Sequence, residues 1–197
     1  MKTKLLDLIV CPECKRRLSL VIIEEKDNEI KEGALKCPCS KEYKITNFIP
    51  RFVDNDKYVD SFSFEWQVHS KTQLDSANTD HISEDTFQAR IDFSLEDLKE
   101  KLVLDAGCGC GRFSEVAAKY GATVVGFDLS FAVDVAFKNI GLKPNVHLIQ
   151  ADIYHLPFHP NTFDLIFSFG VLHHTPDCKR AFKQLPQFLK SKGRISL

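Results

Sequence analysis

Apolar and polar positions in the second half of the chain follow two alternating patterns. Nearly continuous apolar runs, which are typical of strands buried on both faces, occupy 101–105, 123–128, 146–151 and 163–169. Between the runs, apolar residues recur at helical spacing, at Phe113, Val116, Ala117 and Tyr120 and again at Ala181, Phe182, Leu185, Phe188 and Leu189. The alternation predicts an α/β fold with a mainly parallel sheet.

Turn-forming residues predict where several of these elements begin and end. Ser94 and Asp97 have the spacing of a capping box before a short helix. Gly121 suits the C-terminal end of the first long helix. Ser130 is expected to cap a helix that runs to about Asn139.

The last helical pattern contains Pro186. Because proline inside a helix costs about 3 kcal/mol, we expect this helix to bend there or to begin later than the pattern suggests. Residues 193–197 then predict a fifth strand. We expect the sheet to be incomplete after it, with an exposed edge that a partner or a second copy of the chain would cover.

The chain divides into three zones. Residues 1–53 hold four cysteines, short β-like runs and many turn residues, and 101–197 form the α/β domain. Residues 54–100 are polar and aromatic without a strong period, and we interpret them as a linker or lid. The aromatic side chains of this zone are candidates for covering a cofactor or for packing between the two modules, and they are Phe62, Phe64 and Trp66.

Composition narrows the classes of function. The chain is 44% hydrophobic and 27% charged, which is typical of globular proteins, and its net charge of −1 gives no overall case for nucleic acid. It lacks a membrane-length apolar run and the apolar core of a signal peptide, so we expect a cytoplasmic protein without a membrane partner. Seven cysteines in such a chain favour metal binding and free thiols over disulfides.

The segment VLDAGCGCGRF, residues 103–113, predicts a strand, a glycine-rich turn and the start of a helix. Such a turn is expected to bring bare backbone N–H groups against a ligand. Its G-x-G-x-G spacing differs from the dinucleotide pattern, which would place glycine where Arg112 stands. Asp105 would repel a pyrophosphate and attract a cation. These features favour S-adenosylmethionine (SAM), which carries an ammonium and a sulfonium but no phosphate.

Two further acids follow the next two strands. Asp128 ends the second strand, where a carboxylate can accept both hydroxyls of a ribose. Asp152 follows the third strand and is a candidate acceptor for an adenine amine, and Ile153 is a candidate cover for the adenine face. Because open α/β sheets bind ligands at the carboxyl ends of their strands, three acids at successive strand ends predict one ligand site.

Four segments together resemble the class I SAM-dependent methyltransferases, in particular methyltransferase type 11. They are VLDAGCGCGRF (103–113), VVGFDLS (124–130), QADIYHLPF (150–158) and FDLIFSFGVLHHTPD (163–177). The resemblance implies a Rossmann-like, doubly wound sheet with helices on both faces. It implies the methionyl part of SAM at Asp105 and Gly107, the ribose at Asp128 and the adenine at Asp152. The cofactor-binding residues expected on this basis are Asp105, Gly107, Cys108, Gly109, Gly111, Asp128, Leu129, Asp152, Ile153 and Phe169.

The N-terminal zone contains two close cysteine pairs, Cys11 with Cys14 and Cys37 with Cys39. Two such pairs separated by a β-rich segment can close a structural zinc site with four thiolates, although the second pair is C-x-C rather than C-x₂-C. Four free thiols without a metal are the alternative. The segments CPECKRRLSL (11–20) and LKCPCSKEYKITNFIPRF (35–52) resemble the small zinc-ribbon proteins that bind and stabilise tRNA, rRNA and protein methyltransferases.

Other residues allow more than one interpretation. Five cations of the N-terminal zone form either a basic patch that contacts RNA or an ordinary solvated face, and they are Lys2, Lys4, Lys15, Arg16 and Arg17. His173 and His174 follow the fourth strand and are either a catalytic base or loop-shaping residues. Cys108 and Cys110 are expected to be small residues packed beneath the cofactor, and Cys178 a free thiol.

The sequence therefore favours an enzyme that transfers a methyl group from SAM to an N, O or C nucleophile. The acceptor is unidentified; near-neutral charge favours a small molecule, and protein or RNA docked on the basic ribbon are alternatives. A SAM-binding assembly protein without turnover is a second hypothesis. Dinucleotide-dependent redox chemistry is disfavoured by Asp105 and by the glycine spacing.

Overall fold

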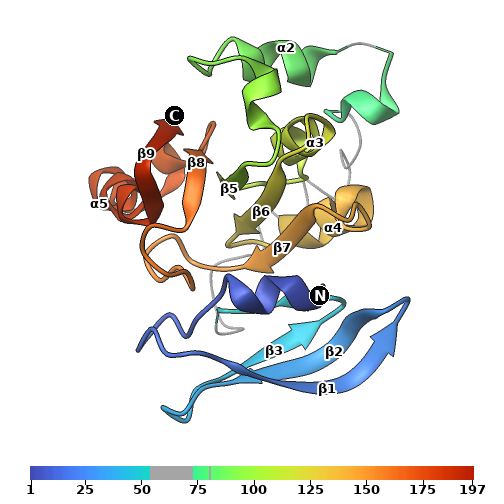
Figure 1. The fold of residues 1–197 in the computed structure, drawn as a ribbon, viewed down its shortest axis with the longest axis vertical. Coiled ribbons are helices and arrows are strands. Elements are labelled where there is room, and N and C mark those ends of the chain that lie inside the picture. Colours follow the sequence, from blue (N-terminus) through green and yellow to red (C-terminus); the bar gives the residue numbers. More distant parts are fainter. Residues whose placement is uncertain (54–72, 80) are drawn as a thin grey trace.

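The computed structural model describes residues 1–53, 73–79 and 81–197, which form two β-sheets and the helices around them (Figure 1). The aromatic residues expected in a lid, Phe62, Phe64 and Trp66, lie outside the described residues. No helix in the described part of the chain has the length and apolar character needed to span a bilayer.

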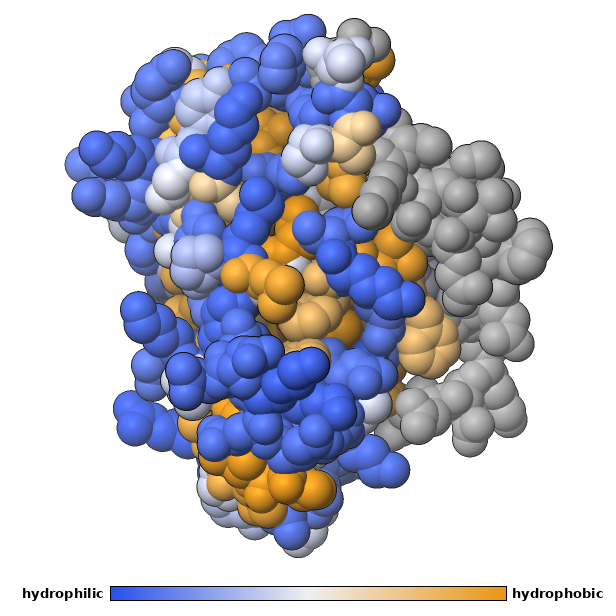
Figure 2. Space-filling model, turned by 90° about the vertical axis from the view of Figure 1, so that its right-hand side faces the viewer, coloured by the Kyte–Doolittle hydropathy of each residue, from blue (hydrophilic) through white to orange (hydrophobic). Residues whose placement is uncertain are grey.

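The N-terminal zone folds as a small antiparallel sheet with the order β1-β2-β3-β4. A 3₁₀ helix, η1 (Thr3–Asp7), precedes β1 (Ser19–Lys26), β2 (Glu29–Lys36), β3 (Glu42–Thr46) and β4 (Ile49–Pro50). The edge strand β1 leaves Val21, Ile22 and Ile23 at 40%, 47% and 74% exposure. Apolar atoms accordingly show at the lower end of the molecule, where this sheet lies (Figure 2).

The second sheet has five parallel strands in the order β7-β6-β5-β8-β9. Its strands are β5 (Leu102–Ala106), β6 (Thr123–Asp128), β7 (Val146–Gln150), β8 (Phe163–Phe167) and β9 (Leu189–Ser196). Since β5 lies between β6 and β8, the chain winds outward from the centre in both directions. The predicted doubly wound α/β fold is confirmed.

Helices cover both faces of this sheet because successive side chains of each strand point to opposite sides. On one face, Val103 and Val124 pack with α2 (Ile82–Gln88), α3 (Arg112–Lys119) and α4 (Ala132–Ile140). On the other face, Leu104 and Val125 pack with α5 (Cys178–Gln184) and with the N-terminal zone. Short 3₁₀ turns complete the set, and they are η2 (Asp75–Ala77), η3 (Leu95–Leu98), η4 (Leu172–His174) and η5 (Pro186–Phe188).

Two expected helix boundaries are wrong. The last helix neither bends at Pro186 nor begins later; α5 ends at Gln184, and Pro186 starts η5, because proline lacks the N–H that would continue the helix. Ser130 does not occupy the N-cap of α4, which is Phe131. Its hydroxyl still accepts from the N–H of Ala132 at 3.1 Å.

The two sheets are joined rather than merely tethered. Arg51, just after β4, forms a parallel bridge with Gln150 of β7, and the N–H of Phe52 donates to the carbonyl of Gln150 at 2.8 Å. A second bridge pairs Ile9 with Phe158. A continuous apolar core runs from the N-terminal zone into the five-stranded sheet, so the two parts bury each other.

Candidate functional site

The three predicted acids lie at one edge of the five-stranded sheet. Asp105 is near the carboxyl end of β5, Asp128 ends β6, and Asp152 follows β7. The strand register places Asp105 opposite Gly126 and Asp128 opposite Gln150. Parallel pairing therefore gathers the carboxyl ends of three adjacent strands, as the sequence predicts.

The glycine loop, residues 106–111, uses its amides inside the protein. The N–H groups of Gly107 and Cys108 both donate to the carbonyl of Phe127 at 2.9 Å, and the N–H of Gly109 donates to Asp128 at 3.0 Å. The expectation of bare N–H groups is wrong at these three positions, because the pairing of β5 with β6 brings acceptors of β6 against the loop. A phosphate would have to displace these partners, whereas a cationic ligand has no need of them.

Glycine is required in this loop by packing as well as by backbone angles. Gly107 has φ of +86°, and a Cβ there would lie 2.4 Å from the Val171 side chain. Gly111 has φ of +90°, and a Cβ there would lie 2.6 Å from Ile140. Both positions favour glycine because other residues rarely adopt such angles.

Asp105 is an acid held in an apolar environment. Its side chain is 3% exposed, and one carboxylate oxygen accepts from the hydroxyl of Ser114 in α3 at 2.7 Å. Burial raises the pKa of Asp105 to about 7; the hydrogen bond from Ser114 opposes this rise, and the negative charge of Asp128 adds to it. Among the described residues no cation pairs with this buried carboxylate, and a positively charged ligand would supply one.

Asp128 is fixed in one orientation at the end of β6. One oxygen accepts from Gly109 at 3.0 Å, and the other accepts from the N–H and the hydroxyl of Ser130 at 2.8 and 2.7 Å. Burial raises the pKa of Asp128 while these hydrogen bonds lower it. The N–H of Leu129 also lowers the pKa of this carboxylate through a hydrogen bond, so donors of the β5 loop and of the residues after β6 hold Asp128 together.

The acid after β7 shapes its own turn. One oxygen of Asp152 accepts from the N–H of Tyr154 at 2.9 Å, and the other lies 3.5 Å from His155. Ile153 is 8% exposed and belongs to the core shared with the N-terminal zone. Leu129, which follows Asp128, is 39% exposed.

The residues after β8 divide into a buried aromatic and an exposed histidine pair. Phe169 is 9% exposed and packs edge-on against Phe87 of α2 and Phe113 of α3, with ring centroids 5.8 and 5.2 Å apart. His173 and His174 are exposed on η4, with ring centroids 4.0 Å apart. Their exposure leaves them accessible to an acceptor molecule.

The four cysteines of the N-terminal zone form one cluster. Sulfur–sulfur distances are 3.7 Å for Cys11 and Cys39, 3.3 Å for Cys14 and Cys37, and 3.1 Å for Cys37 and Cys39. A zinc ion with Zn–S bonds of about 2.3 Å separates tetrahedral sulfurs by roughly 3.8 Å. The thiols are therefore gathered almost at the spacing that a Cys₄ zinc site needs, and the residues fit the metal.

Neighbouring groups support the thiolates. The hydroxyl of Tyr43 lies 3.3 Å from the sulfur of Cys11, and the Arg16 side chain donates to the sulfur of Cys14 at 3.4 Å. Such outer contacts orient ligands and stabilise their negative charge. Tyr43 was missed from the sequence, since a tyrosine within a short strand carries no local sign of a metal-supporting role.

Three cations of the predicted basic patch bond to other groups of the protein. Lys2 donates to the carbonyl of Gly141 at 2.6 Å, and Lys15 donates to that of Leu156 at 2.8 Å. Both contacts cross between the two sheets, and Arg16 supports the cysteine cluster. Three of the five cations thus have structural partners, which weakens the case for an RNA-binding surface.

The remaining cysteines lie apart from this cluster. Cys108 and Cys110 are buried at 6% and 1% exposure, as expected for small packed residues, and the sulfur of Cys108 would lie 3.3 Å from a Cβ at Gly126. Cys178 is exposed at the start of α5.

Two family models match separate parts of the chain. Residues 104–197 match the family model described as "Methyltransferase domain", and residues 2–42 match that described as "Trm112p-like protein". The ubiquinone biosynthesis O-methyltransferase of Coxiella burnetii is 38% identical over 100 residues, which cover 50% of this chain and 43% of that protein. The chain thus matches less than half the length of this relative.

Solved structures extend the likeness to the fold. A Methanococcus maripaludis protein described as a SAM-dependent methyltransferase aligns with a TM-score of 0.56 at 24% identity, covering 72% of this chain and 67% of its own. A chain from the complex of the Haloferax volcanii Trm112 methyltransferase activator with a protein described as a methyltransferase gives 0.55 at 20% identity, covering 70% and 59%. Residues 104–197 are thus similar to the methyltransferase domain family, and residues 2–42 are similar to the Trm112p-like family.

Proposed function

We propose that the chain is an enzyme that transfers a methyl group from SAM to a nucleophilic N, O or C atom of an acceptor. One observation carries the choice of cofactor. The amides of Gly107, Cys108 and Gly109 are already bonded within the protein, while the buried carboxylate of Asp105 just before them has no cationic partner in the part of the chain that the structure describes. This arrangement suits a cationic sulfonium and leaves none of these three amides free to donate to a diphosphate.

Each strand end has a proposed role toward SAM. Asp105 and the loop from Gly107 to Gly111 would bind the methionyl part, together with Phe169 after β8. Asp128 would accept from the ribose, with Leu129 beside it. Asp152 and Ile153 would bind the adenine. SAM supplies a methyl group on a sulfonium that is already a good leaving group, so the chain needs chiefly to align the acceptor in line with the methyl–sulfur bond.

Replacement of Asp128 by alanine is expected to weaken SAM binding by roughly 1–3 kcal/mol, because a charged hydrogen bond to the ribose is lost. Calorimetric titration of the zinc-loaded chain with SAM measures this. Asp92→Ala is the control, since the Asp92 side chain is 80% exposed and pairs with Arg194 of β9, which is not among the proposed cofactor-binding residues. Wild-type affinity in Asp128→Ala would remove the ribose assignment.

His173 and His174 are proposed as alternative bases that take a proton from the attacking atom. Replacing the histidine that acts as the base by alanine is expected to slow methyl transfer about 100-fold, which is the lower end of the range for general-base catalysis. The affinity for SAM should be unchanged. The measurement is transfer of label from SAM under single-turnover conditions. Full rates in both single variants and in the double variant would retire this role.

The acceptor is best sought among small molecules, because the net charge is −1 and three cations of the basic patch have internal partners. Methyl transfer from labelled SAM to fractions of a cell extract, before and after nuclease and protease treatment, distinguishes small molecule, RNA and protein. SAM binding without transfer to any fraction would favour the assembly protein instead. A location in the cytoplasm remains our expectation from the sequence.

We propose that the N-terminal zone, residues 1–53, holds a structural zinc at Cys11, Cys14, Cys37 and Cys39 and serves the methyltransferase domain of its own chain. The support is the shared core and the two β-bridges between the sheets. In the Haloferax complex, Trm112 is described as a methyltransferase activator bound to a separate protein, and here the corresponding pair would lie in one chain. Residues 54–100 would link the two domains, their α2 also packing on the five-stranded sheet, with 101–197 forming the second.

A further inference from the structure

Arg51 lies where the two sheets meet, and both sheets fix its backbone. Its N–H donates to the carbonyl of Lys44 in β3 at 2.8 Å. On the other side it forms the parallel bridge with Gln150 of β7, whose carbonyl accepts from Phe52 at 2.8 Å. The Arg51 side chain therefore leaves the ribbon at a defined point beside the five-stranded sheet.

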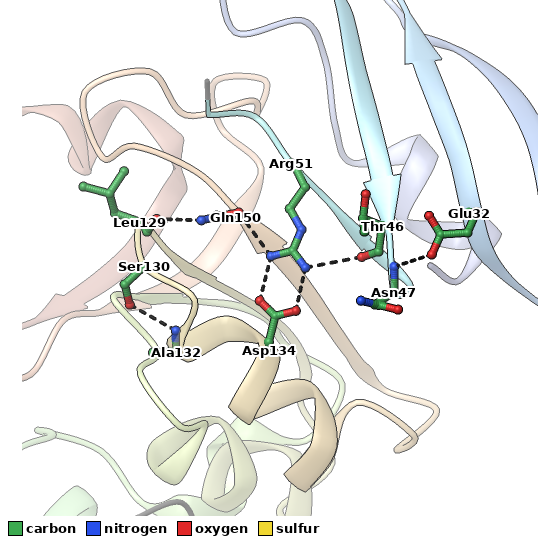
Figure 3. Close-up of polar contacts among 9 residues, drawn as sticks. All are labelled: Glu32, Thr46, Asn47, Arg51, Leu129, Ser130, Ala132, Asp134 and Gln150. Carbon is green, nitrogen blue, oxygen red and sulfur yellow. Dashed lines mark hydrogen bonds and ion pairs between the residues drawn. The ribbon is translucent and has the colours of Figure 1, made fainter. Parts of the chain in front are cut away.

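The guanidinium of Arg51 binds Asp134 in the first turn of α4 (Figure 3). Its two terminal nitrogens donate to the two oxygens of Asp134 at 2.8 and 2.6 Å, a paired geometry that only arginine offers. One nitrogen also donates to the side-chain oxygen of Gln150 at 3.1 Å, and the other to the carbonyl of Thr46 at 3.3 Å. The Arg51 side chain is 9% exposed, so these bonds are little screened by solvent.

Gln150 extends this contact to the β6–α4 loop, residues 129–131. Its side-chain nitrogen donates to the carbonyl of Leu129 at 2.9 Å, and the residue is 2% exposed. The ring of Phe131 lies 5.9 Å from the Arg51 guanidinium. Asp134, one turn further, is in the first turn of α4. Arg51 and Gln150 thus contact the loop at Leu129 and Phe131, and Arg51 binds the first turn of the helix that follows it.

We infer that Arg51 is a positioning residue for the cofactor: through Gln150 and Asp134 it holds the β6–α4 loop in the shape that presents Asp128 to the ribose. This inference rests on the proposed function. It makes affinity for the nucleoside half of SAM depend on a side chain at the edge of the N-terminal sheet, 77 positions before Asp128 in the chain (128 − 51).

The contacts explain why this dependence is specific. Asp128 orients itself through Gly109 and Ser130, but the carbonyl of Leu129 and the start of α4 are bonded by Gln150 and Arg51. Loss of the Arg51 fork frees the loop to shift by the fractions of an ångström that spoil a hydrogen bond. Loop ordering is then an added cost of binding SAM.

The test uses the full zinc-loaded chain and two variants. Arg51→Lys keeps the charge and removes the fork, and Gln150→Met keeps the length and removes the bond to Leu129. Titration with SAM and with S-adenosylhomocysteine is expected to show Kd raised about tenfold in both variants, which corresponds to one lost hydrogen bond. The factor should be equal for the two ligands, because they share the nucleoside and differ in the charge on sulfur.

Lys2→Met is the matched control. Lys2 also crosses between the sheets, but it bonds the carbonyl of Gly141 just beyond the C-terminal end of α4, away from the β6–α4 loop. We expect Lys2→Met to change zinc content and melting temperature by the same amount as Arg51→Lys does, and to leave the Kd for SAM unchanged. Wild-type Kd in Arg51→Lys and Gln150→Met, or an equal loss in Lys2→Met, would overturn the inference. Failure of the unaltered chain to bind SAM would instead overturn the proposed function.

Discussion

Cys37→Ser is expected to release the zinc and unfold the four-stranded sheet. The sulfur of Cys37 lies within 3.3 Å of two other cluster sulfurs, and the residue is 7% exposed. A serine hydroxyl at this buried position cannot replace the thiolate as a zinc ligand. Structural zinc contributes on the order of 10 kcal/mol to the folding of isolated zinc-binding peptides. A module of about 50 residues has a small core, so a metal would supply much of its folding energy.

The loss should be smaller here than in an isolated zinc finger, because the ribbon also packs on the larger domain. Ile30, Leu35 and Ile45 are at most 1% exposed and belong to the shared core. We therefore expect the free energy of unfolding to fall by about 5 kcal/mol, which is a large part of a typical domain's stability. Metal analysis and urea unfolding measure the two effects.

Cys178→Ser is the matched control for this change. Cys178 is an exposed thiol on α5, outside the cluster, and its replacement should leave one zinc per chain and unaltered stability. A Cys37→Ser chain that keeps its zinc, or that loses the metal with no change in unfolding, would show that the cluster does not hold the ribbon together.

Asp105→Asn is expected to make the ligand-free chain more stable and to weaken SAM binding. Folding raises the pKa of Asp105 from 3.8 to about 7, so the folded state binds a proton that the unfolded state has released. Stability from this group is present below about pH 4 and is lost as the pH rises to 7. Each pKa unit corresponds to about 1.4 kcal/mol, so keeping Asp105 ionised lowers the free energy of unfolding by up to about 4 kcal/mol at pH 8.

Asparagine removes this cost while it keeps an oxygen for the hydroxyl of Ser114. The variant should therefore exceed the original chain in stability by roughly 2–4 kcal/mol at pH 8, with the difference vanishing near pH 4. Thermal or urea unfolding across this range measures it. Asp92→Asn, at an exposed position, should change stability little at any pH.

The cofactor reverses the sign of this effect. A sulfonium near Asp105 favours its ionised form, so the affinity of the original chain for SAM should fall about tenfold from pH 8 to pH 6 as the carboxyl takes up a proton. Asp105→Asn should bind SAM roughly ten- to a hundredfold more weakly at pH 8, with little pH dependence. S-adenosylhomocysteine lacks the positive charge on sulfur, so its affinity should fall less than that of SAM in Asp105→Asn. Unchanged SAM affinity in the variant would place the sulfonium elsewhere.

The parallel sheet and its three acids could be read from the sequence. A strand buried on both faces requires a continuous apolar run, and the residue that ends such a run lies at the sheet's carboxyl edge. The spacing of Cys11, Cys14, Cys37 and Cys39 likewise predicted that their sulfurs would meet. In each case the pattern lies within one segment or follows from one strand pairing.

Only the tertiary structure decided which groups these residues meet. The loop amides, expected to be bare, bond to Phe127 and Asp128 because β6 pairs beside β5. Arg51 hydrogen-bonds to Asp134, 83 positions later in the chain, and Lys15 to the carbonyl of Leu156, 141 positions later. Local periodicity determines which side of a strand or helix is buried, whereas the partner of a polar group depends on how the two sheets dock, and that is settled by the shared core of the whole chain.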